Sequence, residues 1–406
     1  MLTKGMLAKE LKINLGLSLW MVFLTFPLVA LKVDYLDKTL VWHLDNLLWV
    51  ALSSFLISGV WRYFLHHYQP KERLNTGHRF SFAEALANEK AMLFFLCLLS
   101  ISPLLTSTYQ TSILITAMMY IALGLGLNIV VGMAGLLDLG YVAFYACGAY
   151  AYGLLNQYYG LGFWQVLLVG GFMAAFLGVI LGFPVLRLRG DYLAIVTLGF
   201  GEIIRMVLEN EEELTSGPSG IANIPKPSFF GAELSYHQNI LFLFYIMLAI
   251  LLLAIVITRR LQLSRIGRAW MAIRENEIAA EAMGIDLTKT KLTAFGIGAF
   301  WAGVVGVVFA AKSSFINPAS FAFHESAIIL SIVVLGGMGS ILGVVLAALI
   351  LVLLPEYLRF LAEYRMLFFG AIMVIMMVFR PQGLISRMRA GYDRDPEMNA
   401  GENLDD

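Results

Sequence analysis

Only one formally charged residue, Asp138, lies between Lys90 and Arg187, and the uncharged segments on either side of it constrain what this chain can fold into. Each segment is more than twice the roughly 20 residues that a helix needs to cross a lipid bilayer. The chain is 59% hydrophobic and 14% charged, and apolar runs of this length exceed what a water-soluble core requires. We therefore predict an all-α, polytopic membrane protein.

Apolar runs of suitable length recur along most of the chain. We expect spans at residues 13–31, 47–65, 91–105, 113–131, 139–155, 164–186, 192–208, 240–258 and 292–311. Two further apolar regions follow, at 326–354 and 366–379. Glycines at Gly336, Gly337 and Gly339 interrupt the first of these regions, so it fits either one long helix or two short ones. The prediction is about ten to twelve transmembrane or re-entrant helices.

The distribution of Lys and Arg predicts the orientation of the chain. Basic clusters occur at the N-terminus, at 62–90, at 187–189, at 259–291 and after residue 379, and these faces are expected to be cytoplasmic. The segment 209–237 is acidic and is expected to lie outside. Both termini are then cytoplasmic, which requires an even number of crossings.

The distribution of apolar and charged residues divides the chain into three parts. Residues 1–105 are predicted to be an N-terminal membrane extension, which contains a polar cytoplasmic linker at 66–90. Residues 106–386 form the transport core and include the cytoplasmic loop 259–291. Residues 387–406 are polar and acidic without an apolar pattern, so we expect a disordered cytoplasmic tail.

Polar groups and glycines interrupt the apolar run around residues 127–140. Irregular backbone and ionisable groups persist at membrane depth only if protein buries them or if they line a wet cavity. Asn128, Gly132, Gly135 and Asp138 are therefore our candidates for the lining of a translocation path. Asp138 also fits a second role, as a cap of the helix that follows it.

The loop 259–291 contains strong helix formers over residues 268–283, followed by Gly284 as a C-cap. Its charges are mixed, and Trp270, Ile278 and Met283 are apolar. Two interpretations remain open from these residues alone. The loop is either a basic cytoplasmic segment that rests against the membrane domain or a docking helix for a cytoplasmic partner.

Other polar or small residues inside apolar runs have structural interpretations. Glu202 and Arg205 are three residues apart, so they fit an ion pair near the end of a span or a substrate ligand. Gly178 and Gly182 indicate close helix packing. The two cysteines, Cys97 and Cys147, are interpreted as small core side chains.

The sequence lacks the motifs that several classes of function require. The chain has no Gly-Lys dipeptide and hence no phosphate-binding P-loop, and its six histidines match no metal-ligand spacing. We expect no catalytic residues, no metal and no cofactor, and the net charge of zero gives no indication of nucleic-acid binding. A proton-coupled secondary transporter with Asp138 or Glu202 as relay remains an alternative to an ATP-driven importer.

Four ordered blocks carry a family resemblance: 126–141, 182–203, 267–284 and 334–340, with a fifth short match at 216–221. They resemble the permease subunits of bacterial branched-chain amino acid ABC transporters, of the LivM type. The segment after residue 221 is shorter than is typical of that family.

The resemblance implies an ABC importer permease fold in the bacterial inner membrane. It also implies a second permease subunit, two cytoplasmic ATP-binding subunits and a periplasmic amino-acid-binding protein for leucine, isoleucine and valine. Related permeases carry urea or short amides instead. The resemblance further implies that the loop 259–291 couples this subunit to the ATPases. The residues implied for this role are Arg268, Trp270, Arg274, Glu277, Ala279, Ala280 and Gly284. ATP hydrolysis is then expected on the partner subunits and not on this chain.

Overall fold

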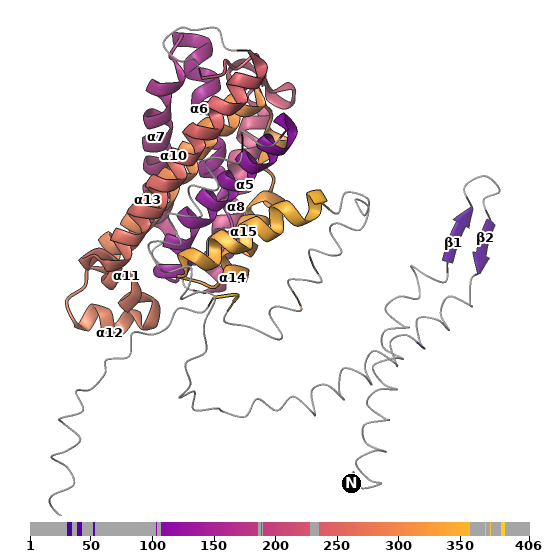
Figure 1. Cartoon of the computed structure of the whole chain (residues 1–406). Coiled ribbons are helices and arrows are strands. Elements are labelled where there is room, and N and C mark those ends of the chain that lie inside the picture. The colour runs from indigo at the N-terminus through magenta and orange to yellow at the C-terminus, as the bar shows by residue number, and fades with distance from the viewer. Residues whose placement is uncertain are drawn as a thin grey trace, which may run out of the picture. The chain divides into compact units, whose positions relative to one another are not determined.

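The structure is a computed structural model (Figure 1) that describes residues 31–34, 39–42, 107–185, 190–227 and 235–357, with a few isolated positions elsewhere. The chain divides into two compact units, Met1–Arg79 and Phe80–Asp406. This division falls within the linker predicted at 66–90, whereas the predicted part boundaries at 105 and 386 stay predictions. The tail at 387–406 lies outside the described residues.

The described residues of the first unit form a short antiparallel strand pair. Strand β1 (Leu31–Asp34) pairs with β2 (Thr39–Trp42), with Leu31 opposite Trp42. The prediction of an all-α chain missed this pair, because a strand of four residues is too short for its alternation of apolar and polar residues to stand out from chance.

Helices dominate the described part of the second unit. In chain order they are α5 (Thr108–Leu127), the π-helix η1 (Asn128–Met133), α6 (Val142–Tyr159), α7 (Phe163–Val185), α8 (Asp191–Asn210), α9 (Glu212–Thr215), the 3₁₀ turn η2 (Gly217–Ser219), α10 (Tyr236–Leu263), α11 (Arg265–Glu275), α12 (Glu277–Ala282), α13 (Leu287–Ser313), the 3₁₀ turn η3 (Pro318–Phe321), α14 (Phe323–Gly336) and α15 (Ile341–Tyr357). Strands β3 (Ile221–Ala222) and β4 (Phe315–Ile316) form a second antiparallel pair.

Five of the described helical segments are long and apolar enough to cross a membrane: Thr108–Met133, Phe163–Pro184, Tyr236–Leu263, Leu287–Ser313 and Pro318–Gly336. The region 326–354 is two helices, α14 and α15, as one of the two sequence interpretations had it. The spans expected at 13–31, 47–65, 91–105 and 366–379 lie almost entirely outside the described residues. A mostly helical, polytopic architecture is therefore observed, and the number of crossings stays a prediction.

Helix α13 lies at the centre of the bundle and packs closely on α7. A Cβ added to Gly178 would lie 2.7 Å from Ala299 Cβ, and one added to Gly303 would lie 2.5 Å from Ala174 Cβ. Small residues permit this approach, and in lipid close packing of this kind is a main source of helix association. The predicted packing role of Gly178 is confirmed, and Gly182 packs in the same way against Leu292.

The outward face of α7 is apolar and exposed. Phe172, Phe176 and Phe183 each expose about two thirds of their surface. A water-soluble chain rarely exposes a continuous apolar face of this kind, whereas contact with lipid or with a second membrane subunit favours it.

The two ends of the bundle differ. At one end Thr108 Oγ1 lies 2.9 Å from His237 Nδ1, which brings the start of α5 to the start of α10, and we call it the loop end. Helices α11 and α12, which we call the arm, lie together at the other end (Figure 1), which we call the arm end.

Candidate functional site

Two glycine-containing segments interrupt the regular helices: Asn128–Met133 (η1) and the turn Gly337–Gly339. We call them the two breaks. They are far apart in sequence and meet at the arm end. The side-chain carbonyl of Asn128 accepts a hydrogen bond from the backbone N–H of Gly339 at 2.8 Å. A Cβ on Gly132 would lie 2.6 Å from Gly339 N and would overlap the Asn128 carbonyl. Gly132 therefore allows the backbone of η1 to contact the turn between α14 and α15.

That turn requires glycine for its backbone conformation. Helix α14 ends at Gly336, and Gly337 and Gly339 have φ values of +104° and +88°. L side chains rarely adopt this region, so the predicted helix breaks lie at residues that reverse the chain direction. The result is a fixed turn whose buried peptide groups are hydrogen-bonded, with the N–H of Gly339 bound to Asn128 of η1.

Hydrogen bonds join the arm and the end of α10 to the two breaks. Arg274 Nη1, from α11, donates to the carbonyl of Gly132 at 2.5 Å, and Gln262 Nε2, from the end of α10, donates to the carbonyl of Gly339 at 3.0 Å. Gly135 (φ +73°) lies against the Arg274 side chain, where a Cβ would be 2.8 Å from Arg274 Cγ. The arm is therefore bonded directly to Gly132, and the end of α10, from which the arm starts, is bonded to Gly339.

Asn128 and Asp138 are fully buried in this conformation. Among the described residues Asn128 Nδ2 and Asp138 Oδ2 have no hydrogen-bond partner, although each side chain uses its other polar atom. Burying an unpaired polar group costs about 1–3 kcal/mol, so the two atoms mark a segment that packing alone does not explain.

Asp138 does not cap the following helix as one sequence interpretation held. Its Oδ1 accepts from Gly140 N at 2.9 Å, whereas the N-cap position of α6 is Tyr141, which makes no side-chain cap. The carboxylate closes the turn before the helix instead. Asp138 lies three positions ahead of the N-cap residue, whereas a capping side chain belongs to the N-cap residue itself.

The arm consists of two short helices joined at Asn276. The Asn276 carbonyl caps α12 by accepting from Ile278 N at 3.0 Å and from Ala279 N at 3.1 Å. At the other end Gly284 (φ +85°) completes a Schellman motif, in which Ile285 N donates to Ala280 O and Gly284 N donates to Glu281 O. The predicted helical segment and its glycine stop are confirmed, and Asn276 divides the segment into two helices.

The coupling residues expected from the resemblance fall into two groups. Trp270 is fully buried and donates from Nε1 to Thr290 O at 2.8 Å, while Glu277 pairs with the buried Lys291 at 2.7 Å. These contacts hold the arm on α13. Arg268, Ala279 and Gly284 are exposed, whereas Ala280 is buried.

Two apolar side chains of this part of the chain point away from the core. Ile278 is 69% exposed and Met283 is 84% exposed. Exposed large apolar residues on a segment that is otherwise well anchored are a property of contact surfaces. The arm therefore has a fixed inner side and an uncovered apolar outer side.

Two intramembrane charges were missed by the sequence analysis. Lys312, in the last turn of α13, donates to Thr116 Oγ1, and Glu325, in the first turn of α14, accepts from Tyr120 OH at 2.5 Å. Their sequence signal was a lone charge at the edge of an apolar run.

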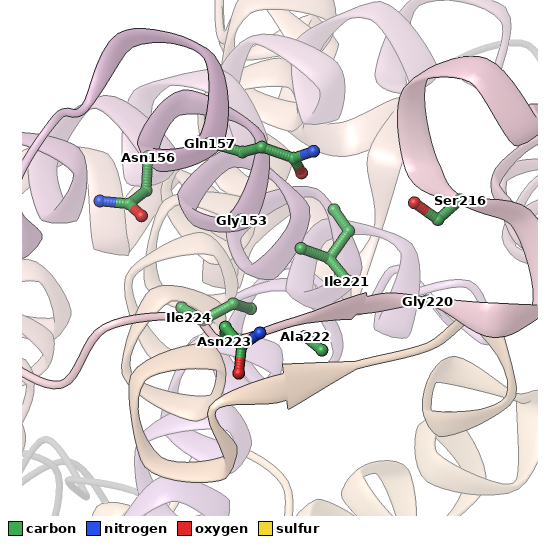
Figure 2. Close-up of a pocket in the computed structure, with 9 residues that line it drawn as sticks. All are labelled: Gly153, Asn156, Gln157, Ser216, Gly220, Ile221, Ala222, Asn223 and Ile224. Carbon is green, nitrogen blue, oxygen red and sulfur yellow. The ribbon is translucent and has the colours of Figure 1, made fainter.

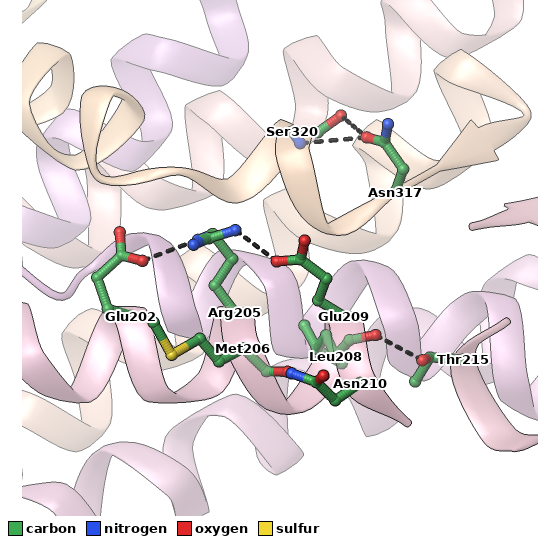
Figure 3. A network of polar contacts seen from close by, with 9 residues as sticks. All are labelled: Glu202, Arg205, Met206, Leu208, Glu209, Asn210, Thr215, Asn317 and Ser320. Atoms are coloured by element: carbon green, nitrogen blue, oxygen red, sulfur yellow. Dashed lines mark hydrogen bonds and ion pairs between the residues drawn. The ribbon is translucent and has the colours of Figure 1, made fainter. Parts of the chain in front are cut away.

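The loop end carries a polar network on α8. Arg205 binds Glu202 at 2.8 Å and Glu209 at 2.7 Å, and Figure 3 shows the three side chains in a row along the helix. The predicted Glu202–Arg205 pair is confirmed, and Glu209 extends it by one turn. With both carboxylates engaged by Arg205, the pair is part of the structure of α8 and not an isolated ligand site.

A shallow pocket of about 330 Å³ also lies at the loop end (Figure 2). It is bounded by the end of α6 at Asn156 and Gln157 and by the segment from Ser216 to Ile224. Ser216 (φ +60°) and Asn223 (φ +59°) hold that segment in its turn. Among the described residues no group of three metal-binding side chains occurs, here or elsewhere.

Residues 109–377 match the family model described as "Branched-chain amino acid transport system / permease component". The chain is 49% identical over 323 residues to the "High-affinity branched-chain amino acid transport system permease protein LivM" of Escherichia coli (strain K12), covering 74% of this chain and 76% of the relative. It is 25% identical over 287 residues to the permease protein LivH of the same organism, covering 66% of this chain and 91% of the relative. No solved structure matches the chain significantly.

Proposed function

Because the chain belongs to the family of branched-chain amino acid transport permease components, we propose that it is a membrane-spanning subunit of an ATP-driven importer for leucine, isoleucine and valine. The observation that carries the proposal is the 49% identity to a LivM permease over most of both chains. The five long apolar helices and the exposed apolar face of α7 agree with this role.

The chain pairs with a second, dissimilar permease subunit of the LivH kind. Two cytoplasmic ATP-binding subunits and a periplasmic amino-acid-binding protein complete the importer. This arrangement follows from the family and from the absence of a Gly-Lys dipeptide in the sequence, since a chain without a P-loop depends on partners for ATP. The arm end faces the cytoplasm, as its Lys and Arg content favours, with both termini on the same side.

The arm couples this subunit to the ATPases. Ile278 and Met283 offer the apolar contact, with Arg268, Ala279 and Gly284 beside them at the surface. Trp270, Arg274 and Glu277 act from the inner side, because their contacts hold the arm on α13 and on the glycine breaks. Movement of the ATPases is thereby passed to η1 and to the turn at Gly337–Gly339.

Asn128, Gly132, Gly135 and Asp138 contribute to the translocation path in another state of the transport cycle. The support is the buried Asn128 Nδ2 and Asp138 Oδ2, which lack a partner among the described residues, together with the two breaks in regular helix at Asn128–Met133 and Gly337–Gly339. Polar groups of this kind are what a zwitterionic amino acid requires at membrane depth. The present conformation, with both side chains buried, is then a closed one.

The proposal is tested by reconstitution of the chain in proteoliposomes with the second permease, the ATPases and the binding protein. We expect ATP-dependent uptake of leucine, isoleucine and valine and no uptake of urea or short amides. Uptake driven by a proton gradient without ATP would contradict the proposal, and ATP-driven uptake of urea alone would reassign the substrate.

The isolated subunit gives a second test. Purified alone, it should bind no ATP, because it lacks a phosphate-binding loop. Specific nucleotide binding at micromolar affinity by the isolated chain, measured by calorimetry, would contradict the assignment of ATP hydrolysis to partner subunits.

A further inference from the structure

Two opposite charges contact the same face of helix α5, in the half of the bundle toward the loop end. Lys312 and Glu325 come from different helices, but they contact residues one turn apart on the same face of α5, Thr116 and Tyr120. Residues at i and i+4 of a helix are about 5–6 Å apart at Cβ. The ammonium and the carboxylate are thus brought to one short stretch of a membrane-spanning helix.

Both charges have only neutral contacts among the described residues. Thr116 Oγ1 donates to Ser112 O at 3.0 Å, so it receives the hydrogen bond from Lys312, and Glu325 is bound by the Tyr120 hydroxyl. No ion pair within the described ranges includes Lys312 or Glu325. An ammonium group has three donors and a carboxylate has about four acceptor positions, so each retains unused bonding capacity.

A charge at membrane depth is costly unless it is paired or functional. Lys312 and Glu325 are only half-buried, so neither belongs to the packed core. If their role were mutual neutralisation, the expected arrangement would be a direct ion pair, which the structure does not contain between them. The molecule that neutralises both charges at once is one that carries a carboxylate and an ammonium close together.

An apolar surface lies next to the charges. Phe309 is one turn before Lys312 on α13 and is half-buried, and its ring centroid is 5.8 Å from that of Phe321, which precedes α14. Three residues along a helix is a same-face spacing, so Phe309 and Lys312 lie on the same face of α13. A branched aliphatic side chain is the kind of group that such a surface accommodates.

From these observations we propose that Lys312 binds the α-carboxylate and Glu325 the α-ammonium of an amino acid in transit, with the aliphatic side chain toward Phe309. The inference rests on the proposed import of branched-chain amino acids and adds the residues that contact the substrate.

The test compares three ligands on the purified complex of both permeases and the ATPases, without the binding protein. Leucine carries both charges, leucinamide has no carboxylate, and 4-methylpentanoate has no amino group. The variants are Lys312→Gln and Glu325→Gln, which remove a charge while keeping a hydrogen-bonding group for Thr116 or Tyr120. Lys289→Gln and Glu213→Gln, at exposed positions, serve as matched controls.

We expect Lys312→Gln to weaken leucine binding by at least about tenfold and to leave leucinamide binding unchanged, because only leucine loses a charge-assisted contact. Glu325→Gln should weaken leucine binding similarly and leave 4-methylpentanoate binding unchanged. A structural role alone would change the affinity for all three ligands together, and that result, or no change for leucine, would overturn the proposal.

If a glutamine variant fails to assemble, Lys312→Arg and Glu325→Asp carry the test, since they keep the charges and should keep the preference for leucine over the two analogues. Loss of that preference would overturn the site. A wild-type complex that takes up leucine with ATP but binds none of the three ligands would also overturn the site and leave the proposed function intact. A wild-type complex without leucine uptake would contradict the proposed function itself.

Discussion

At the scale of single residues, the contact between the two breaks requires that position 132 carry no side chain. A Cβ there would lie 2.6 Å from Gly339 N, and it would displace the Asn128 carbonyl that accepts from the same N–H. We expect Gly132→Ala to lower the free energy of unfolding by about 1–3 kcal/mol, because the contact must open to admit the methyl group.

The measurement is the thermal unfolding of the purified complex, with Gly199→Ala on α8 as the control. A Cβ at Gly199 meets no atom within 4 Å, so that variant should be neutral or slightly stabilising through helix propensity. Equal unfolding temperatures for the two variants would show that the breaks are not packed as described.

A second residue-scale prediction concerns Glu277, one of the residues that the family resemblance implies for coupling to the ATPases. The structure shows that Glu277 also makes a contact within this chain, which a charge reversal would disrupt. The side chain of Lys291 is 4% exposed and pairs with Glu277 at 2.7 Å, so Glu277→Lys leaves a buried ammonium facing a like charge. Loss of one partner of a buried pair costs about 3–5 kcal/mol, and less here because the Glu277 side chain is 22% exposed.

The expected outcome is faster proteolysis of the arm and a lower unfolding temperature for Glu277→Lys. The double variant Glu277→Lys with Lys291→Glu should recover most of the stability, since the pair is restored in reverse. A double variant as unstable as the single one would place the effect of Glu277 at the partner interface instead.

At the scale of elements, the arm shows what local sequence predicts and what it does not. Helix formers ended by glycine predicted the helical segment and its stop at Gly284, because propensity and caps are local properties. The sequence did not predict that Trp270 is buried on Thr290 O or that Arg274 reaches Gly132, because those contacts depend on how α10 and α13 place the arm. The sequence left open whether the loop rests against the membrane domain or docks a partner, and the contacts of Trp270 and Arg274 show the first of these for the inner side of the arm.

Gly284 provides the element-scale prediction. Its φ of +85° is unfavourable for other residues, although a Cβ there meets no atom within 4 Å. Gly284→Val should therefore disturb the exit of α12 and reduce the substrate-stimulated ATPase rate of the reconstituted complex about fivefold or more, with assembly retained.

The matched control is Gly160→Val at the end of α6. Gly160 has a φ of +64° and is equally open, so the backbone strain is similar, but it lies away from the arm. Both variants should lose a similar amount of stability, about 1–2 kcal/mol, and only Gly284→Val should lose coupling. An equal loss of coupling in both would mean that the effect is general destabilisation.

At the scale of the whole molecule, the sequence predicted the apolar helices well, because a bilayer requires uninterrupted apolar length and that requirement is visible in one dimension. It predicted each glycine break for the same reason. The meeting of the two breaks, and the grouping of Lys312 with Glu325, were not predictable, because they require that α5, α13 and α14 be brought together in space. The sequence thus predicted the separate segments of the candidate site, and the structure showed which of them are in contact.

The assembled site implies a change of access during transport. Asn128 is fully buried here, so a cysteine at position 128, in a background where Cys97 and Cys147 are replaced, should not react with a small water-soluble thiol reagent in the resting complex. A path lining must become wet in at least one state, so reaction should appear when the complex turns over ATP with leucine and its binding protein.

Tyr159→Cys is the reference, because Tyr159 is 76% exposed at the end of α6 and should react in every state. The rates of modification are measured by mass shift with nucleotide absent, with a non-hydrolysable analogue and during turnover. If position 128 stays unreactive in all three conditions in an active transporter, the segment Asn128–Met133 has a packing role only. Reaction during turnover alone would show that the two breaks separate as the arm moves, because the Asn128 carbonyl is released from Gly339 when they do.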